Sequence, residues 1–312
     1  MAPDIEKRGV DAGRGEIRRR FVRFVNDHVV AVMAGVPLLV LSVLFVYPLF
    51  WMLYQSMWVT VPGLEPRIDP LYNYGQVLVS SDFRRSTGRM FLYAIGSFSL
   101  SFTGGLFFAL LINRVRRRWL RTTYLTVLML VLAIPVSVAA LMWGAILAER
   151  EAALLDMVLL DLGLVAEPVA YLQLESLALP LVAFIDGWLR MPLATLVFLA
   201  GRRAVPPRLY EAARIDGATT LQAFRHVTLP QLRPHVLTVV LLLWASAFQA
   251  FSVVWVLTDG GPIHRTRTIA LFIYEVGILY LDFGKGAAIS ASLAVVTVVV
   301  TAIYMRRFVN TR

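Results

Sequence analysis

Long apolar blocks alternate with short polar segments along most of this chain of 312 residues. A helix needs about 20 mostly apolar residues to cross a hydrocarbon core about 30 Å thick. Six stretches meet that length, and we predict a membrane-spanning helix in each of them. They are residues 29–56, 91–113, 122–147, 177–200, 236–258 and 286–305. The pattern therefore predicts an all-α integral membrane protein with six transmembrane helices.

The polar segments between these stretches differ in charge, and the difference indicates an orientation in the membrane. Arginine is abundant before the first span, after the second, after the fourth and after the sixth. The loop 148–176 instead carries six acidic residues against the single Arg150, whereas loops 57–90 and 259–285 have mixed charge. Because arginine is enriched in cytoplasmic loops, we place both termini and the loop 201–234 in the cytoplasm.

Three parts of unequal size follow from this topology. Residues 1–28 are expected to form a basic cytoplasmic tail, residues 29–308 a transmembrane domain, and residues 309–312 a cytoplasmic C-terminus. A cleaved signal peptide is not expected, because the apolar run after the first arginines is too long and lacks a small-residue cleavage site.

Composition agrees with a lipid environment and excludes several functions. The chain is 58% hydrophobic and 16% charged, whereas a soluble domain carries about a quarter charged residues. Its net charge of +10 is explained by arginines in the cytoplasmic loops, so nucleic-acid binding is not expected. The absence of cysteine excludes disulfides, thiolate zinc sites and cysteine nucleophiles. The four histidines have no ligand spacing, so no metal site is predicted.

The cytoplasmic loop 201–234 contains the signals of two short helices joined at a corner. Pro207 fits the first turn of a helix, where a missing backbone donor is tolerated, and Gly217 fits its end. Thr219 and Gln222 have the spacing of a capping box for a second helix. Leu229 and Pro230 are then expected to turn the chain back toward the membrane. Small alanines between these signals allow a partner protein to approach closely.

This loop resembles the cytoplasmic EAA loop of permease subunits in bacterial ATP-binding-cassette importers. The family pattern is EAA, a glycine shortly afterwards and Leu-Pro about a dozen residues later. The resemblance implies that the loop forms coupling helices that insert into a groove on an ATPase subunit. The residues that it assigns to this contact are Glu211, Ala212, Ala213, Asp216, Gly217, Ala218, Leu229 and Pro230.

A second resemblance covers about residues 30–310 and concerns carbohydrate permeases of the maltose-transporter kind. It rests on LTDGGP at 257–262, on Thr266 and Tyr274, and on DFGKGAAIS at 282–290. The two glycines and the proline of the first segment predict a turn. Small residues in the last segment allow close helix packing, and they are Gly284, Gly286, Ala287 and Ala288. The chain departs from the pattern in its third span, where Pro135 stands without the second proline that these permeases often carry.

Together the resemblances imply a type I importer permease fold in a bacterial cytoplasmic (inner) membrane. The implied function is to pass a sugar or sugar-like solute from an extracytoplasmic solute-binding protein into the cytoplasm. The implied partners are a second permease in a heterodimer, two ATPase subunits, the binding protein and membrane lipid. The chain has no G-x-x-x-x-G-K-[ST] sequence. We therefore expect no enzyme activity and no bound cofactor in this chain, with ATP and Mg on the ATPase subunits.

Two intramembrane segments are candidates for the substrate pathway. Asp186 and Arg190 lie four residues apart in the fourth span, where an unpaired charge is costly and a functional role is the default. The alternative is a structural ion pair, and Pro192 is expected to kink or open the helix there. In the fifth span, Ser246 and Gln249 are three residues apart and are expected to share one helical face with Ala250. The resemblance to carbohydrate permeases further implies that the segment from Trp188 to Leu193 contributes to the substrate site. The candidates are therefore Asp186, Trp188, Arg190, Leu193, Ser246, Gln249 and Ala250.

Other functions remain as alternatives at this point. One is an importer of the same class that carries a phosphorylated polyol or a glycerophosphodiester. Arg190 favours this alternative, because it stands where carbohydrate permeases often have a small residue and would add a positive charge. A secondary transporter driven by an ion gradient is another, although it leaves the docking loop unexplained. A membrane enzyme is not supported, since no cluster of catalytic side chains is visible. The sequence identifies neither the solute nor the partner permease.

Overall fold

The computed structural model describes residues 33–60, 65–148 and 153–309, with a few residues between 20 and 31. Two compact units make up the chain, Met1–Gln55 and Ser56–Arg312. In the first unit, a helix from Asp27 to Gln55 is long and apolar enough to cross a membrane, as predicted. It contains a π-helical turn at Ser42–Val46 and ends as α2 (Tyr47–Gln55). The predicted tail 1–28 lies almost entirely outside the described residues.

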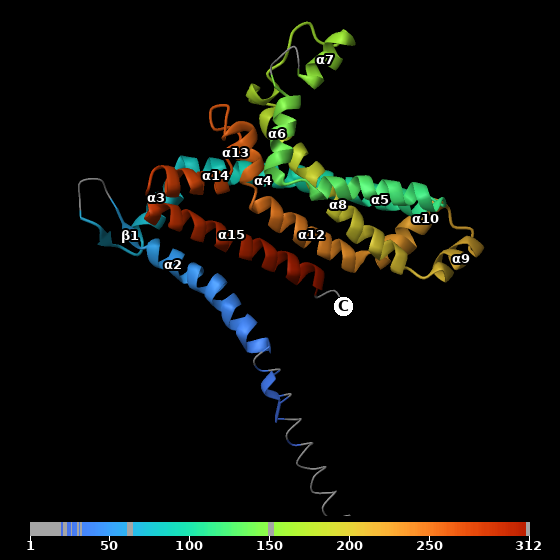
Figure 1. Ribbon diagram of the computed structural model, residues 1–312, viewed down its shortest axis with the longest axis horizontal. Coiled ribbons are helices and arrows are strands. Elements are labelled where there is room, and N and C mark those ends of the chain that lie inside the picture. The colour runs from blue at the N-terminus through green and yellow to red at the C-terminus, as the bar shows by residue number, and fades with distance from the viewer. Residues whose placement is uncertain are drawn as a thin grey trace, which may run out of the picture. The chain divides into compact units, whose positions relative to one another are not determined.

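The second unit is built around three long helices (Figure 1), which are α4 (Ser81–Arg114), α8 (Ala178–Ala204) and α15 (Phe283–Val309). Helix α4 packs along α8 over most of its length, and α12 (Arg233–Phe248) packs against both. Across the described residues of both units, four helices can span a membrane, or six if each of two bent helix pairs counts as one span. The prediction of six spans agrees with the larger count.

Helix α4 begins ten residues before the predicted second span, because its first turns are polar. Ser80 caps the helix, and its hydroxyl oxygen accepts a hydrogen bond from the Phe83 amide at 3.4 Å. A hydropathy window finds only the apolar part of such a helix, whereas a serine N-cap stabilises the polar part as well.

The third and fifth spans are broken, contrary to the prediction of continuous helices. The third consists of α5 (Arg118–Ala133) and α6 (Val136–Ile146), which meet at Pro135 with an angle of 98°. A lone proline suffices because it removes a backbone donor and clashes with the preceding turn. In the fifth, α12 ends at Phe248 and α13 (Ser252–Thr258) starts after a three-residue break at Gln249–Phe251.

Helix α8, by contrast, runs unbroken through Pro192, so of the expected kink or opening the opening does not occur. Contacts with α4 hold the helix before and after the proline. The Ser101 hydroxyl of α4 donates to the Gly187 carbonyl at 2.9 Å. On the other side, a Cβ added to Gly105 would lie 2.5 Å from the Ala194 Cβ, so the two backbones are in close contact. Such packing from a neighbouring helix allows proline inside a membrane helix.

The segments between the spans contain short elements of their own. The loop after the first unit forms a two-stranded antiparallel sheet with Trp58 opposite Ile68. The acidic loop 148–176 contains α7, and the loop 259–285 contains α14 and a π-helical turn. Their bounds are β1 (Trp58–Val59), β2 (Arg67–Ile68), α3 (Tyr72–Val79), α7 (Leu154–Asp161), a 3-10 turn (Tyr171–Gln173), α14 (Ile269–Tyr274) and the π-helical turn Glu275–Leu279.

The glycines of the DFGKGAAIS segment lie at close backbone contacts, as predicted. Gly284 at the start of α15 faces the Trp58 carbonyl so closely that no side chain fits. A Cβ on Gly286 would lie 2.7 Å from the Gly277 Cα. Nearby, the buried Arg267 binds Asp82 at 2.8 Å and Glu275 at 3.2 Å, which ties the 259–285 segment to the first turn of α4.

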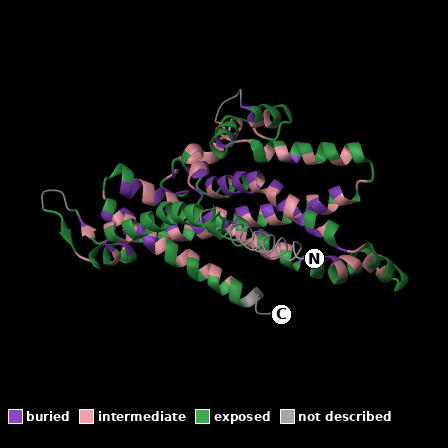
Figure 2. Cartoon of the chain, turned by 60° about the horizontal axis from the view of Figure 1, so that its bottom comes forward, coloured by how far each residue is buried: buried purple, intermediate pink, exposed green. Residues whose placement is uncertain are grey.

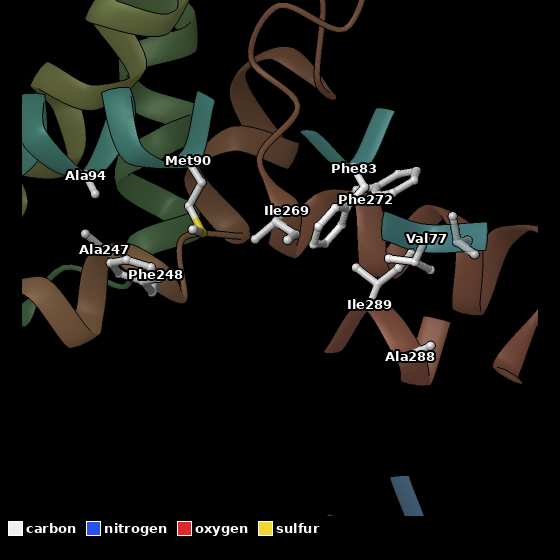
Figure 3. Packing of buried hydrophobic residues seen from close by; sticks show 11 residues of the cluster. Val77, Phe83, Met90, Ala94, Ala247, Phe248, Ile269, Phe272, Ala288 and Ile289 are labelled. Atoms are coloured by element: carbon white, nitrogen blue, oxygen red, sulfur yellow. The ribbon is translucent and has the colours of Figure 1, made fainter. Parts of the chain in front are cut away.

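Buried apolar side chains form clusters at both ends of the long helices. One cluster joins α3, α4, α12, α14 and α15, and Phe83, Phe272 and Ile289 lie together in it (Figure 3). Another joins α4, α5, α8 and α12 and includes Ile112 and Phe198. This second cluster lies where the helices lead into the predicted coupling loop, so it positions that loop.

Candidate coupling surface and intramembrane polar site

The predicted coupling loop folds into the two short helices that its sequence indicates, at one end of the second unit (Figure 1). Helix α9 (Pro207–Ile215) has proline at its first position. Gly217 follows with a φ of +73°, a left-handed conformation that favours glycine. The Asp216 amide donates to the Ala212 carbonyl at 3.0 Å and the Ala218 amide to the Ala213 carbonyl at 2.8 Å, which closes the helix end.

The second short helix begins with the predicted capping box. The Thr219 amide donates to the Gln222 side-chain oxygen at 2.7 Å, and the Gln222 amide donates to the Thr219 hydroxyl at 3.3 Å. The helix continues as α10 (Thr220–Ala223), a π-helical turn (Phe224–Thr228) and α11 (Leu229–Gln231). Leu229 and Pro230 are therefore helical, and the chain bends by 69° after Gln231, slightly later than predicted.

Tyr210 fixes α9 against the second short helix. Its hydroxyl shares a hydrogen bond of 2.8 Å with the Thr228 hydroxyl, and its ring lies 4.0 Å from the Arg202 guanidinium carbon. Arg202 belongs to the last turn of α8. One aromatic side chain thus joins the end of a long helix to both short helices, and the corner between them has a defined geometry.

Exposed and half-buried residues predominate at the end of the second unit that holds α9 and α10 (Figure 2). Of the predicted contact residues, Glu211, Ala212, Asp216, Gly217, Leu229 and Pro230 are exposed, and Ala213 and Ala218 are half-buried. Two large apolar side chains on either side of Gly217, Ile215 and Leu221, are not among the predicted contact residues. Ile215 is 86% exposed and Leu221 is 74% exposed. The sequence signal for them is an apolar residue on either side of a polar turn, and together they add apolar surface to the corner.

The intramembrane charges form a closed polar cluster. Asp186 is 1% exposed and binds Arg190 through a 2.8 Å contact between Oδ2 and Nε. The Ser97 hydroxyl of α4 donates to the same carboxylate oxygen at 2.5 Å. The Arg190 side chain keeps 23% of its surface exposed. The ion pair therefore neutralises Asp186 within α8, and the Ser97 hydroxyl links this carboxylate to α4. The Arg190 side chain stays partly exposed.

The other pathway candidates lie on α8, on α12 and in the break that follows α12. Trp188 packs edge to face on Trp143 with ring centres 5.6 Å apart, and Leu193 is half-buried. Ser246 donates to the Leu242 carbonyl within its own helix at 2.7 Å. Among the described residues, no hydrogen bond or ion pair joins the candidates of α8 to those of α12.

Ser246, Gln249 and Ala250 do not share one helical face, and this expectation is wrong. Gln249 lies just beyond the end of α12 and is exposed, and Ala250 is buried in the break. The Thr268 hydroxyl donates to the Ala250 carbonyl at 3.2 Å. A tertiary contact thus satisfies a backbone group that a continuous helix would have satisfied itself, and hydropathy contains no signal for it.

Within the described ranges, no three histidine or acidic side chains come together in a way that would hold a metal ion.

Comparison with known proteins gives the chain a family. Residues 101–312 match the family described as binding-protein-dependent transport system inner membrane component. A trehalose/maltose transport permease, MalF of Thermococcus litoralis, is 32% identical over 86% of this chain and 88% of its own length. An arabinooligosaccharide transport permease, AraP of Bacillus subtilis, is 30% identical over 85% of this chain and 83% of its own length.

A solved structure shares the fold. A chain of a bacterial ABC transporter that imports the acidic polysaccharide alginate superposes with a TM-score of 0.80, at 20% identity. The match covers 94% of this chain and 99% of that one. The fold is therefore that of an importer permease. From the family match and the relatives together, the protein belongs to the inner-membrane permeases of binding-protein-dependent ABC transport systems.

Proposed function

We propose that this chain passes a sugar or sugar-like solute into the cytoplasm as one permease of a heterodimeric importer. Its relatives include permeases named for trehalose/maltose and arabinooligosaccharide transport. The solute arrives on an extracytoplasmic binding protein, and two ATPase subunits hydrolyse ATP with Mg. Both termini and the coupling loop face these ATPases from the cytoplasmic side, in accord with the arginine distribution.

The observation that carries the proposal is the exposed corner formed by α9, Gly217 and α10. It presents Glu211 and Asp216 together with the apolar Ile215 and Leu221, held in place by Tyr210. A rigid surface that combines apolar anchors with charged edges suits insertion into a groove on another protein. ATP-driven closure of the ATPases would move two such corners together and rock the attached helices.

The intramembrane charges favour a neutral solute over a phosphorylated one. Asp186 neutralises Arg190 through their direct contact, so the pair contributes no net charge to the pathway. The guanidinium group still offers hydrogen-bond donors, which suit the hydroxyl groups of a sugar. Substrate sites in membrane transporters commonly lie at the midplane, where such polar groups gather.

Affinity purification of the full chain from its native membrane tests the assembly. Mass spectrometry should find an ATPase, a second six-span permease and a binding protein with the wild-type chain. Glu211→Ala should lose the ATPase but keep the second permease. Glu167→Ala is the matched control, since Glu167 is also exposed but lies in the acidic loop on the opposite side. A chain that purifies alone, or equal ATPase recovery from both variants, would contradict the proposal.

Uptake of labelled solutes tests the substrate class. Cells that depend on this chain should accumulate neutral disaccharides or oligosaccharides in preference to glycerol phosphates. Arg190→Ala should change the KM for the transported sugar while membrane insertion stays intact. Preferential uptake of the phosphorylated compounds would reject the neutral-sugar assignment and leave the docking surface unaffected.

A further inference from the structure

A cavity of 610 Å³ lies beneath the coupling corner, between the ends of two long helices and the two short ones. Its volume falls within the range of about 300–1,000 Å³ that is usual for ligand sites. The walls come from the last turns of α4 and α8, from α9, from α10 and from the π-helical turn that follows. Its polar lining includes Asn113, Arg114, Arg202, Tyr210, Arg214 and Thr220.

Tyr210 gathers two of the arginines in this cavity. The Arg202 guanidinium carbon lies 4.0 Å from the centre of the tyrosine ring. The Arg214 Nε points to the carbonyl of the same tyrosine at 3.4 Å, a long contact. Because the Tyr210 hydroxyl is held by Thr228, the tyrosine cannot turn away from either group. Two like charges are thus brought to one wall, and Arg114 adds a third.

No counter-charge accompanies these arginines. The cavity lining contains no aspartate and no glutamate. Among the described residues, none of the three arginines forms an ion pair with a carboxylate. Three cations around one cavity repel one another and favour an anion between them. Guanidinium groups bind phosphate oxygens in a paired, planar geometry, which makes phosphate the matching ligand.

The position of the cavity identifies the source of that phosphate. Arg114 is the last residue of α4 and Arg202 lies in the last turn of α8. Both follow directly on the predicted spans 91–113 and 177–200, so we place the cavity at the cytoplasmic end of these spans. Leu110, one turn deeper in α4, supplies an apolar wall. Trp119 follows close by in the chain and is exposed, as is typical of the membrane interface. Basic cavities between helices at this level attract the headgroups of anionic lipids.

We propose that this cavity binds the phosphate of an anionic phospholipid from the cytoplasmic leaflet. The bound phosphate would bridge Arg114 of α4, Arg202 of α8 and Arg214 of α9. It would thereby fasten the coupling corner to the ends of two long helices. Of the residues predicted to contact the ATPase, only Ala218 also lines the cavity. Leu221, an apolar anchor of the docking corner, lines the cavity as well. The three arginines that would hold the phosphate are not among the residues proposed to contact the ATPase, and lipid binding does not depend on the proposed function.

The test uses the purified full-length chain in neutral detergent, with binding of POPG and POPC followed by native mass spectrometry. Wild type should retain POPG in preference to POPC. The double variant Arg202→Gln/Arg214→Gln should weaken POPG binding about 30-fold, at about fivefold for each basic residue near an anionic headgroup. Arg116→Gln/Arg208→Gln removes the same charge from neighbouring exposed positions that do not line the cavity. This control should bind POPG within about twofold of wild type.

Competition with inorganic phosphate distinguishes a lipid headgroup from a soluble anion in this cavity. Millimolar inorganic phosphate should displace little POPG, because the apolar wall also contributes to lipid binding. If phosphate alone displaces it fully, the site serves a soluble oxyanion and the lipid assignment is wrong. Equal retention of POPG and POPC, or equal losses in both double variants, would also overturn it. If the cavity variant fails to fold, Arg114→Gln replaces it, since Arg114 makes no ion pair among the described residues and should still show about a fivefold loss.

The functional consequence rests on the proposed importer role and has a separate readout. In nanodiscs of POPG, the transporter's ATPase activity should respond to substrate-loaded binding protein, and in nanodiscs of POPC the response should weaken. The cavity variant should behave in POPG as wild type behaves in POPC. If the chain binds POPG but purifies without any ATPase, only the proposed function is contradicted. If the stimulated ATPase activity is the same in POPG and POPC nanodiscs, the coupling role of the lipid is contradicted.

Discussion

Replacing Gly217 with alanine isolates the contribution of the corner between α9 and α10 to ATPase docking. The residue has a φ of +73°, and a Cβ at this position would meet no heavy atom within 4 Å. The substitution therefore adds no steric clash, and its cost is that of holding an L-residue in the left-handed conformation. That cost is about 1–2 kcal/mol. In the Gly217→Ala variant without its ATPase, the exposed corner can relax away from this conformation, and docking must restore the conformation.

The expected effect is a loss of affinity for the ATPase of about 5- to 30-fold. This factor is the conformational cost of about 1–2 kcal/mol converted into a ratio of dissociation constants. Gly217→Asn should lose less, because asparagine tolerates the left-handed region better than alanine does. The measurement is a titration of the purified ATPase subunit onto the full-length chain in nanodiscs. Correct insertion of each variant is checked by its recovery with the second permease.

Gly163 provides the matched control. It has a φ of +64° and equally open space around its Cα, but it lies in the loop 148–176 after α7. Gly163→Ala carries the same conformational cost at a site away from the ATPase, so affinity should stay at the wild-type value. Equal losses in Gly163→Ala and Gly217→Ala, or no loss in Gly217→Ala, would refute the assignment of this corner as the docking element.

Three further predictions concern the spans. Gly105→Ala should lower thermal stability in detergent, because overpacking costs about 1–3 kcal/mol and exceeds the gain in helix propensity of about 1 kcal/mol. Gly88→Ala, in open space on the same helix, should be neutral or stabilising. A Gly105→Ala variant that is more stable than Gly88→Ala would contradict the packing of α4 on α8. Asp186→Asn should destabilise the protein by about 3 kcal/mol, since it leaves Arg190 unpaired. The double variant Asp186→Asn/Arg190→Gln should recover part of this loss. Equal stability of the single and the double variant would argue against a coupled pair. A green fluorescent protein fused after the last residue should fluoresce and an alkaline phosphatase should stay inactive, whereas the reverse pattern would overturn the predicted topology.

The parts of the fold that sequence predicts well are those set by local chemistry. Span number follows from length and apolarity, which lipid imposes on every helix separately. The coupling corner is equally local. Pro207, Gly217 and the Thr219–Gln222 pair each act within one turn of the chain, and each is found in its expected role.

The parts that sequence misses depend on contacts between distant segments. Nothing near Gln249 indicates a break, because Thr268 supplies the hydrogen bond that replaces the helical one. Similarly, Pro192 predicts an opening that packing against α4 prevents. Ser97 lies 89 residues before Asp186 and binds it directly, a pairing that no spacing rule anticipates. The surroundings of the candidate substrate pathway are built from such contacts, and for that reason the sequence indicates them less well than it indicates the corner.

The break between α12 and α13 has a mechanical consequence. A continuous helix transmits rotation along its whole length through its ladder of hydrogen bonds, and the ladder is interrupted at Gln249–Phe251. A rotation of α12 at its coupling end therefore need not be passed on to α13. The segment beyond α13 is tied to α4 through the ion pair of Arg267 with Asp82. The two parts of the fifth span can therefore change their orientation independently, so that α12 can follow the coupling loop while α13 stays in place.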